Sequence, residues 1–204
     1  KQKNCQVLML TSSNPASGKS FASLNLAASL ALTGKRTVLL EMDIRKGSKK
    51  GKDGAVLPGV THFLSGKITD LSQLIHLCPG LDELDLMTSG PLPPNPAELL
   101  LGQALDDLIG QLRERYDYIV IDTVPFGMVA DAQIISRVID LCIYVIREGL
   151  MDRRRLSDVE SLYTDGKLPH LSVLLNDAKY KHAGYGYGYG YYGYGYGKSY
   201  YGYQ

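Results

Sequence analysis

The sequence contains no tryptophan, few cysteines and almost no excess of charge of either sign. Its three cysteines, Cys5, Cys78 and Cys142, lie far apart and form no C-x-x-C spacing. We therefore expect reduced structural thiols of a cytosolic protein rather than a disulfide framework or a zinc site. Lys and Arg total 22 against 21 for Asp and Glu, a net charge of +1. This balance gives no general reason to expect binding to nucleic acid or to an anionic membrane.

Long apolar runs are missing as well. No run reaches the roughly 18–20 residues of a membrane-spanning helix, and we expect no signal peptide at the start of the chain. Of the 204 residues, 45% are hydrophobic and 21% are charged, which suits one globular domain with a sizeable core.

Aliphatic residues disappear near the C-terminus, where tyrosine and glycine take over. Eleven of the 15 tyrosines fall between Tyr180 and Tyr203, and residues 183–204 are almost only Gly and Tyr. Glycine makes ordering costly, and no aliphatic side chain is available to anchor the segment. We therefore predict a folded domain over residues 1–182 and a flexible tail over residues 183–204. The alternatives are a low-complexity linker or a stacking surface for single-stranded nucleic acid, and the few cations of the tail argue against nucleic acid.

The body of the chain alternates short apolar runs with longer helical patterns. The runs that indicate strands buried on both faces are Val7–Leu10, Val38–Met42, Tyr118–Ile121, Leu141–Ile146 and Val173–Leu175. Leu84–Leu86 is a further candidate strand. The predicted helices are Lys19–Leu32, Pro96–Arg115, Ala130–Ile139 and Arg153–Tyr163. This alternation predicts an α/β fold, with a mostly parallel β-sheet flanked by helices on both faces. Ligands of such sheets bind beyond the carboxyl ends of the strands.

The segment from Ser13 to Ser20, S-N-P-A-S-G-K-S, follows the first predicted strand and leads directly into a helix. It is the phosphate-binding pattern G-x-x-x-x-G-K-[ST], with Ser13 in place of the first glycine. Backbone N–H groups and the positive helix end would cradle phosphate oxygens, and Gly18 lets the backbone approach them closely. Lys19 would reach the β- and γ-phosphates, and the Ser20 hydroxyl would bind Mg²⁺. The alternative is a chance G-K-S before a helix, which the strand–loop–helix context disfavours.

Two further predicted strands end in carboxylates. Glu41 and Asp43 close one of them, and because strand residues alternate, both side chains should lie on the same side at its ligand-binding end. A close pair of carboxylates repels, so a cation is their natural partner. Asp122 ends another buried strand, where its carboxylate would hold Mg²⁺ through a water. A strand-terminal Asp that caps the next turn is the alternative for each.

Taken together, these motifs resemble those of the bacterial tyrosine kinases that accompany polysaccharide co-polymerases. That family's phosphate loop reads S-S-x-P-x-x-G-K-S, as residues 12–20 do here, and its second motif reads D-x-D-x-R. The segments that match are Ser12–Ser20, Glu41–Arg45, Pro94–Leu100, Ile121–Thr123, Val129–Ala132, Asp140 and Val145–Arg147. The resemblance covers Gln6 to Asn176, and a tyrosine-rich C-terminal tail is typical of the family.

The resemblance implies a P-loop ATPase fold that works as a protein-tyrosine kinase with ATP and Mg²⁺. It also implies a homo-oligomeric ring in which the tail of one subunit enters its neighbour's active site. The whole protein would be anchored in the inner membrane, with this chain as its cytoplasmic domain. Its partners would be a cognate tyrosine phosphatase and the machinery that makes and exports capsular or extracellular polysaccharide.

Site residues follow from the motifs and the resemblance together. The catalytic set comprises Lys19, Glu41, Asp43 and Asp122. The metal set comprises Ser20, Asp43 and Asp122. The nucleotide set comprises Ser13, Pro15, Ala16, Ser17, Gly18, Lys19, Ser20, Phe21, Arg147 and Asn176, the last two as contacts to adenine. The phosphoacceptors are Tyr185, Tyr187, Tyr189, Tyr191, Tyr192, Tyr194, Tyr196, Tyr200, Tyr201 and Tyr203.

Three departures from the family pattern matter. The loop Lys46–Lys52 lacks the proline that the family has after the arginine. Glu41 stands where the family has an aspartate, so its longer side chain places the carboxylate further out. The given sequence begins at Lys1, directly before the first predicted strand, and a helix with an E-x-x-R-x-x-R pattern normally precedes this point in the family. Two rival functions are a MinD/ParA-like ATPase switch and an ATP-binding module whose tail recruits partners. The switch class carries a second loop lysine where Asn14 stands here, and Lys19, Ser20, Asp43 and Asp122 favour turnover over simple binding.

Overall fold

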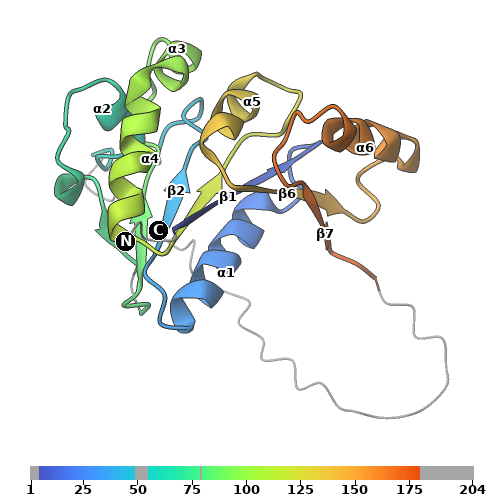
Figure 1. Ribbon diagram of the computed structural model, residues 1–204, viewed down its shortest axis with the longest axis horizontal. Coiled ribbons are helices and arrows are strands. Elements are labelled where there is room, and N and C mark those ends of the chain that lie inside the picture. Colours follow the sequence, from blue (N-terminus) through green and yellow to red (C-terminus); the bar gives the residue numbers. More distant parts are fainter. Residues whose placement is uncertain (1–4, 49–54, 79, 180–204) are drawn as a thin grey trace.

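The computed structural model describes residues 5–48, 55–78 and 80–179 of the chain. The predicted tail over residues 183–204 lies outside the described residues, so the proposed domain boundary stays a prediction. Within the described part, a seven-stranded sheet has the order β3-β4-β2-β5-β1-β6-β7 (Figure 1). Its strands are β1 (Gln6–Ser12), β2 (Thr37–Glu41), β3 (His76–Leu77), β4 (Leu84–Met87), β5 (Tyr118–Asp122), β6 (Leu141–Arg147) and β7 (Ser172–Asn176).

All neighbouring strands are parallel except β3, a short edge strand that was not predicted and that pairs with β4 in antiparallel fashion. The predicted α/β fold with a mostly parallel sheet is confirmed. Its central strands are buried on both faces, since Val7 and Met9 point to one side of β1 and Leu8 and Leu10 to the other. That double burial explains why these strands are continuous apolar runs rather than alternating ones.

Helices cover both faces of the sheet unequally. The helix α1 (Lys19–Leu32) packs on one face through its small residues Ala27 and Ala31. The other described helices pack on the opposite face (Figure 1). They are α2 (Val60–Leu64), α3 (Pro96–Leu101), α4 (Gln103–Arg115), α5 (Asp131–Ile135) and α6 (Leu156–Thr164). The bounds of α1 match the prediction, and Gly34, with φ 76°, follows its end.

Three other helix predictions were wrong in their extent. The predicted helix Pro96–Arg115 is two helices, because Gly102 takes an extended backbone between α3 and α4. The segment Ala130–Ile139 contains only the short α5 and a 3₁₀ turn at Ser136–Val138. The segment Arg153–Tyr163 opens with a 3₁₀ turn, and α6 begins only at Leu156. The helix α2, over Val60–Leu64, was not predicted.

The last strand also differs from its prediction. We expected Val173–Leu175 to be buried on both faces, but the side chains of Val173, Leu174 and Leu175 are 58%, 37% and 60% exposed. The reason is position, because β7 lies at the edge of the sheet and, among the described residues, pairs only with β6. An apolar run therefore indicated the strand correctly but could not show its place in the sheet.

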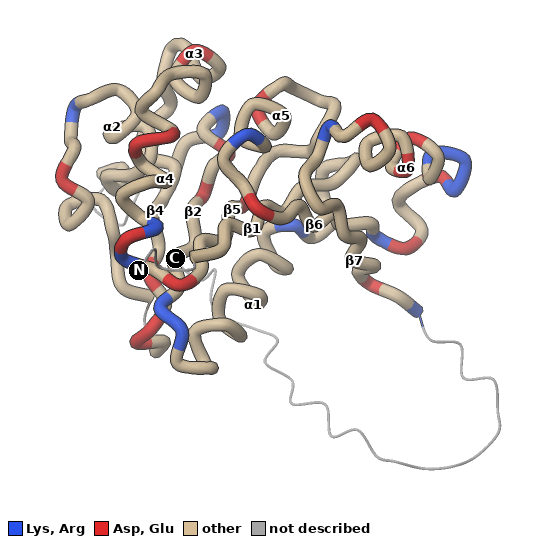
Figure 2. Tube along the Cα trace, viewed as in Figure 1, with Lys and Arg blue, Asp and Glu red and all other residues tan. Residues whose placement is uncertain are grey.

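Acidic and basic residues are interspersed along the described chain, and neither sign gathers on one side in this view (Figure 2). Cys5, Cys78 and Cys142 are free cysteines, and Cys5 and Cys142 are buried. Among the described residues, no helix combines the length and apolarity needed to cross a membrane.

Candidate nucleotide-binding site

The loop between β1 and α1 is built around two residues with left-handed backbones. Ala16 has φ 59° and Gly18 has φ 89°. The backbone angle of Gly18 favours glycine, and a Cβ atom there would lie 2.1 Å from the side-chain nitrogen of Asn176 and displace that amide. No described side chain caps the start of α1, which leaves its first N–H groups for a ligand. An exposed helix start of this kind is a natural place for an anion.

Hydroxyl groups of the loop hold it in shape from inside. Ser12 Oγ and Ser17 Oγ both donate to the backbone oxygen of Asn14, at 2.7 and 2.8 Å. These two hydroxyls, one before and one after the Asn14–Pro15 segment, satisfy the Asn14 carbonyl. The hydrogen bonds that hold the loop in this shape are thus made within the chain, without a ligand.

Arg147 and Asn176, the predicted adenine contacts, lie at the ends of β6 and β7 beside this loop. Arg147 Nη1 donates to the backbone oxygen of Ala16 at 3.1 Å, and Asn176 Nδ2 donates to that of Ser17 at 3.0 Å. Both residues thus reach the nucleotide site, although the contacts shown are to the loop. Their contact with adenine stays a prediction.

Lys19 lies in the first turn of α1 and is only 9% exposed. Its ammonium donates to Ser12 Oγ at 3.1 Å. Burial lowers the pKa of Lys19, and the nearby Lys46 adds to this, while Asp122 and Asp43 act in the opposite direction. A buried ammonium with a lowered pKa gains from an approaching anion, which would restore the charged form.

Asp122 ends β5 and lies in register opposite Leu10 of β1 and Glu41, the last residue of β2. Burial raises the pKa of Asp122, and hydrogen bonds from Ser20 and Ser23 and the charge of Lys19 oppose that rise. Ser23 Oγ lies 3.3 Å from Asp122 Oδ1. A carboxylate held this close to the phosphate loop is suited to bind a cation directly or through water.

Glu41 and Asp43 lie at the end of β2, next to Asp122 and the phosphate loop. Glu41 is the last residue of the strand and lies next to Asp122 in the sheet, while Asp43 follows in the turn after it. The Asp43 side chain is 26% exposed, and its Oδ2 lies 3.3 Å from the ammonium of Lys46. The predicted carboxylates Glu41, Asp43 and Asp122 thus cluster at the carboxyl ends of β2 and β5.

Arg45 fixes the turn that carries Asp43. Its guanidinium donates from Nε and Nη2 to the two carboxylate oxygens of Asp131, at 2.6 and 2.8 Å. Asp131 is fully buried at the start of α5, and Arg45 is 39% exposed. The forked pair connects the acidic turn to a helix on the α5 face of the sheet, although the two residues are 86 positions apart.

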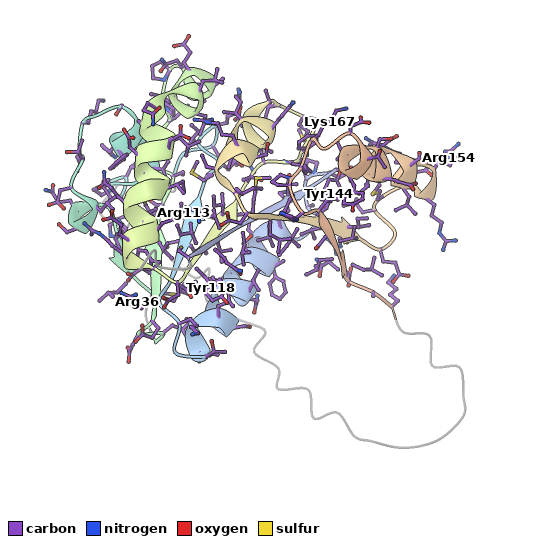
Figure 3. All side chains as sticks on the ribbon, in the orientation of Figure 1. Arg36, Arg113, Tyr118, Tyr144, Arg154 and Lys167 are labelled. Carbon is purple, nitrogen blue, oxygen red and sulfur yellow. The ribbon has the colours of Figure 1, made fainter. Side chains whose placement is uncertain are left out.

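The other predicted nucleotide contacts lie on the outside of the loop. Pro15 and Ala16 are exposed, and Phe21 is 67% exposed on the first turn of α1. Ser13, by contrast, makes a side-chain hydrogen bond to the hydroxyl of Tyr144, and burial raises the pKa of Tyr144. Tyr144 is a buried residue of β6 and is labelled in Figure 3.

Sequence reasoning assigned no role to several residues that the structure places at the site, namely Ser12, Ser23, Asp131 and Tyr144. A signal existed for Ser23, because it shares the buried small-residue stripe of α1 with Ala27 and Ala31 at helical spacing. For Tyr144, which looked like an ordinary strand residue, no signal existed.

The described residues contain no group of three or more His, Cys, Asp or Glu side chains that could hold a metal ion by themselves. The residues predicted to bind the metal are one hydroxyl, Ser20, and the carboxylates Asp43 and Asp122. Hard oxygen donors in small number fit Mg²⁺, which commonly takes one or two protein ligands and completes its shell with phosphates and water.

A glycine–lysine loop before α1 and a strand-terminal aspartate, on a parallel sheet, define a P-loop nucleotide-binding protein of the ATPase class. The chain matches no protein-family model. It is 38% identical over 175 residues to tyrosine-protein kinase CpsD of Streptococcus pneumoniae, covering 84% of this chain and 75% of that protein. The kinase domain of Escherichia coli tyrosine kinase ETK superposes with a TM-score of 0.77 at 29% identity, covering 94% of this chain and 75% of the other.

The fold alone is shared more widely. The septum site-determining protein MinD from Pyrococcus horikoshii superposes with a TM-score of 0.64 at 19% identity, over 84% of this chain and 70% of the other. The sequence identity to CpsD assigns the present chain to a narrower group than the shared fold does. It belongs to the family of bacterial tyrosine-protein kinases, and the predicted enzyme class, a protein-tyrosine kinase, is confirmed.

Proposed function

We propose that this chain uses ATP and Mg²⁺ to phosphorylate tyrosines of its own C-terminal tail, with the tail of one subunit entering the site of its neighbour. The observation that carries the proposal is the buried Lys19 beside Asp122 and the loop hydroxyls, next to the carboxylates of β2. Eleven tyrosines between Tyr180 and Tyr203 of the same chain supply acceptors in number.

The roles follow from the donors at each position. Lys19 would bind the β- and γ-phosphates and balance the charge that builds up as the phosphoryl group is transferred. Ser20, Asp122 and Asp43 would hold Mg²⁺, which when bound neutralises charge on the phosphate oxygens. Asn176 would bind adenine as well, and in support of this none of its hydrogen bonds within the described part of the chain uses Oδ1.

The acceptor phenol requires a base. A tyrosine has a pKa near 10, so at neutral pH it is a poor nucleophile until its proton is removed. We assign the base to Asp43, because its partly exposed side chain follows the end of β2, whereas Glu41 is the last residue of the strand and pairs in register with Asp122. A Gly–Tyr tail suits such a site, because glycine imposes little steric selection on which phenol enters.

The wider assembly is proposed on the family resemblance. A ring of subunits would present each tail to the next site, and each phosphate would add about −1.5 to −2 charges to the tail. Several of these would repel one another and the carboxylates of the site, so phosphorylation would expel the tail and loosen the ring. A tyrosine phosphatase would reverse the modification. The polysaccharide export machinery of the inner membrane would be the system controlled.

The test is mass spectrometry of the tail after phosphatase treatment and incubation with ATP and Mg²⁺. We expect phosphotyrosine within residues 180–203 of the wild type and none in Lys19→Met. Lys35→Met serves as the matched control, because Lys35 is exposed beyond the end of α1 and should leave phosphorylation unchanged. Free phosphate without tail phosphorylation would instead support an ATPase switch of the MinD type, and neither product would support a binding module.

A further inference from the structure

Two side chains at the edge of the sheet bind consecutive peptide groups of the phosphate loop. Arg147 and Asn176 are neighbours in the register of β6 and β7. Arg147 donates to the carbonyl oxygen of Ala16, and Asn176 donates to the carbonyl oxygen of Ser17. The two strands that lie furthest along the chain thus hold the loop formed by the first strand.

The direction of these carbonyls decides where the neighbouring N–H groups point. In a trans peptide the C=O and the N–H lie on opposite sides of the bond, and the described chain contains no cis peptide. Pulling the Ala16 oxygen toward Arg147 therefore turns the N–H of Ser17 the other way. Holding the Ser17 oxygen at Asn176 does the same for the N–H of Gly18. Those two N–H groups belong to the set that a P-loop aims at phosphate.

The backbone conformation at this point needs such support. Ala16 has φ 59°, which is uncommon for a residue with a side chain and persists only where its surroundings hold it. The contact from Arg147 is to the carbonyl of that same residue.

Arg147 is itself held by Asp177. Its Nε and Nη2 lie 3.1 and 3.0 Å from Asp177 Oδ2, while Nη1 is left to bind the loop. Asp177 also has a left-handed backbone, with φ 55°, directly after the end of β7. Two positions later the backbone N–H of Lys179 donates to Glu148, the residue after Arg147. The carboxylate that orients Arg147 thus belongs to the segment from which the tyrosine-rich tail continues.

From these contacts we infer that Arg147, oriented by Asp177, is a positioning residue that sets the phosphate-binding N–H groups of Ser17 and Gly18. Through Asp177, Arg147 also connects the phosphate loop to the segment that precedes the tyrosine-rich tail. The inference rests on the proposed nucleotide binding and deepens it, because it assigns Arg147 to the phosphate end of the ligand. A contact to adenine alone would give Arg147 a different role.

Inorganic pyrophosphate separates the two roles, because it carries phosphate groups but no base. Affinities of ADP and pyrophosphate are measured by calorimetry for the wild type and the Arg147→Gln variant. An exposed charged hydrogen bond makes a modest contribution, so we expect both ligands to bind about three- to tenfold more weakly to the variant. A base contact would weaken ADP and leave pyrophosphate unchanged, and that result would overturn the inference.

Three further variants test the role of Asp177, the recovery of binding by a conservative substitution, and a control position. Asp177→Asn keeps the shape of the carboxylate but loses its charge, so it should weaken both ligands in the same ratio by a smaller factor. Arg147→Lys keeps one donor for Ala16 and should recover part of the loss. Arg154→Gln is the matched control, since Arg154 points away from the body and is 89% exposed (Figure 3). Its affinities should equal those of the wild type.

Thermal melting without nucleotide shows whether the variants fold. If Arg147→Gln does not fold, the comparison rests on Arg147→Lys and Asp177→Asn, which retain polar groups of similar size. Unchanged pyrophosphate affinity in every folded variant of Arg147 and Asp177 would refute the inference. Absence of ADP binding to the wild type would be a separate outcome, because it would refute the proposed nucleotide binding itself.

Discussion

Replacing Arg45 by methionine should destabilise the protein far more than neutralising its partner Asp131. Asp131 is fully buried and accepts two hydrogen bonds from Arg45, whereas Arg45 is 39% exposed. Loss of the arginine leaves a buried carboxylate without its counter-charge. Loss of the carboxylate charge leaves an arginine that can still turn to water. The cost of breaking the pair therefore depends on which side is removed.

The magnitudes follow from this difference. Removing one partner of a fully buried pair costs about 3–5 kcal/mol, and the partial exposure of Arg45 reduces this to about 2–3 kcal/mol for Arg45→Met. Asp131→Asn retains a hydrogen-bond acceptor and should cost about 1 kcal/mol. The double variant buries a neutral amide instead of a charge, so it should be more stable than Arg45→Met alone, by about 1 kcal/mol.

Equilibrium unfolding in urea measures these differences. With a slope of about 2 kcal/mol per molar urea, Arg45→Met should lower the midpoint by about 1 M. Arg36→Met is the control, because Arg36 and Asp117 form an ion pair at 3.5 Å with 49% and 31% exposed side chains. That pair should contribute about 0–1 kcal/mol. Equal losses for Arg45→Met and Asp131→Asn, or a double variant with the sum of both losses, would refute the reasoning.

Two other predictions concern catalysis and pH. Asp43→Asn should lower the rate of tail phosphorylation about 100-fold or more, which is the usual contribution of a general base. Glu41→Gln should lower the rate less. If measured rates of phosphate incorporation rank the two variants in the opposite order, the base is Glu41. Burial raises the pKa of Cys142 from 9.0 to about 12, so its stabilising contribution is complete below pH 9 and is lost as the pH rises from 9 toward 12. Between pH 8 and pH 10 the free energy of unfolding of Cys142→Ala should therefore fall by about 1 kcal/mol less than that of the wild type, and parallel pH curves in urea melts would contradict this.

The strands and the helix that were predicted correctly are those whose positions depend on neighbouring residues in the sequence. Continuous apolar runs indicated the buried strands β1, β2, β5 and β6, because a parallel sheet covered on both faces leaves no polar position inside a strand. The helix α1 was predicted to its ends, since the loop before it and Gly34 after it are explicit boundary signals.

The predictions of helix bounds and strand burial were wrong where these depend on residues that are distant in the sequence but close in the fold. Gly102 divides α3 from α4, although the helical pattern of the sequence runs through it. The exposure of β7 depends on its place at the sheet edge, which an apolar run does not reveal. The small elements α2 and β3 carry too few residues for a periodic signal.

By itself, the sequence determined the α/β class, the phosphate loop with Lys19 and Ser20, and the strand-terminal carboxylates. It could do so because these features are local, and residues a few positions apart create them. Only the tertiary structure decided that Arg45 pairs with Asp131, that Ser23 reaches Asp122, and that Arg147 and Asn176 hold the phosphate loop. Those contacts join residues 86 to 159 positions apart, and the order of the strands in the sheet, rather than any pattern along the chain, brings them together.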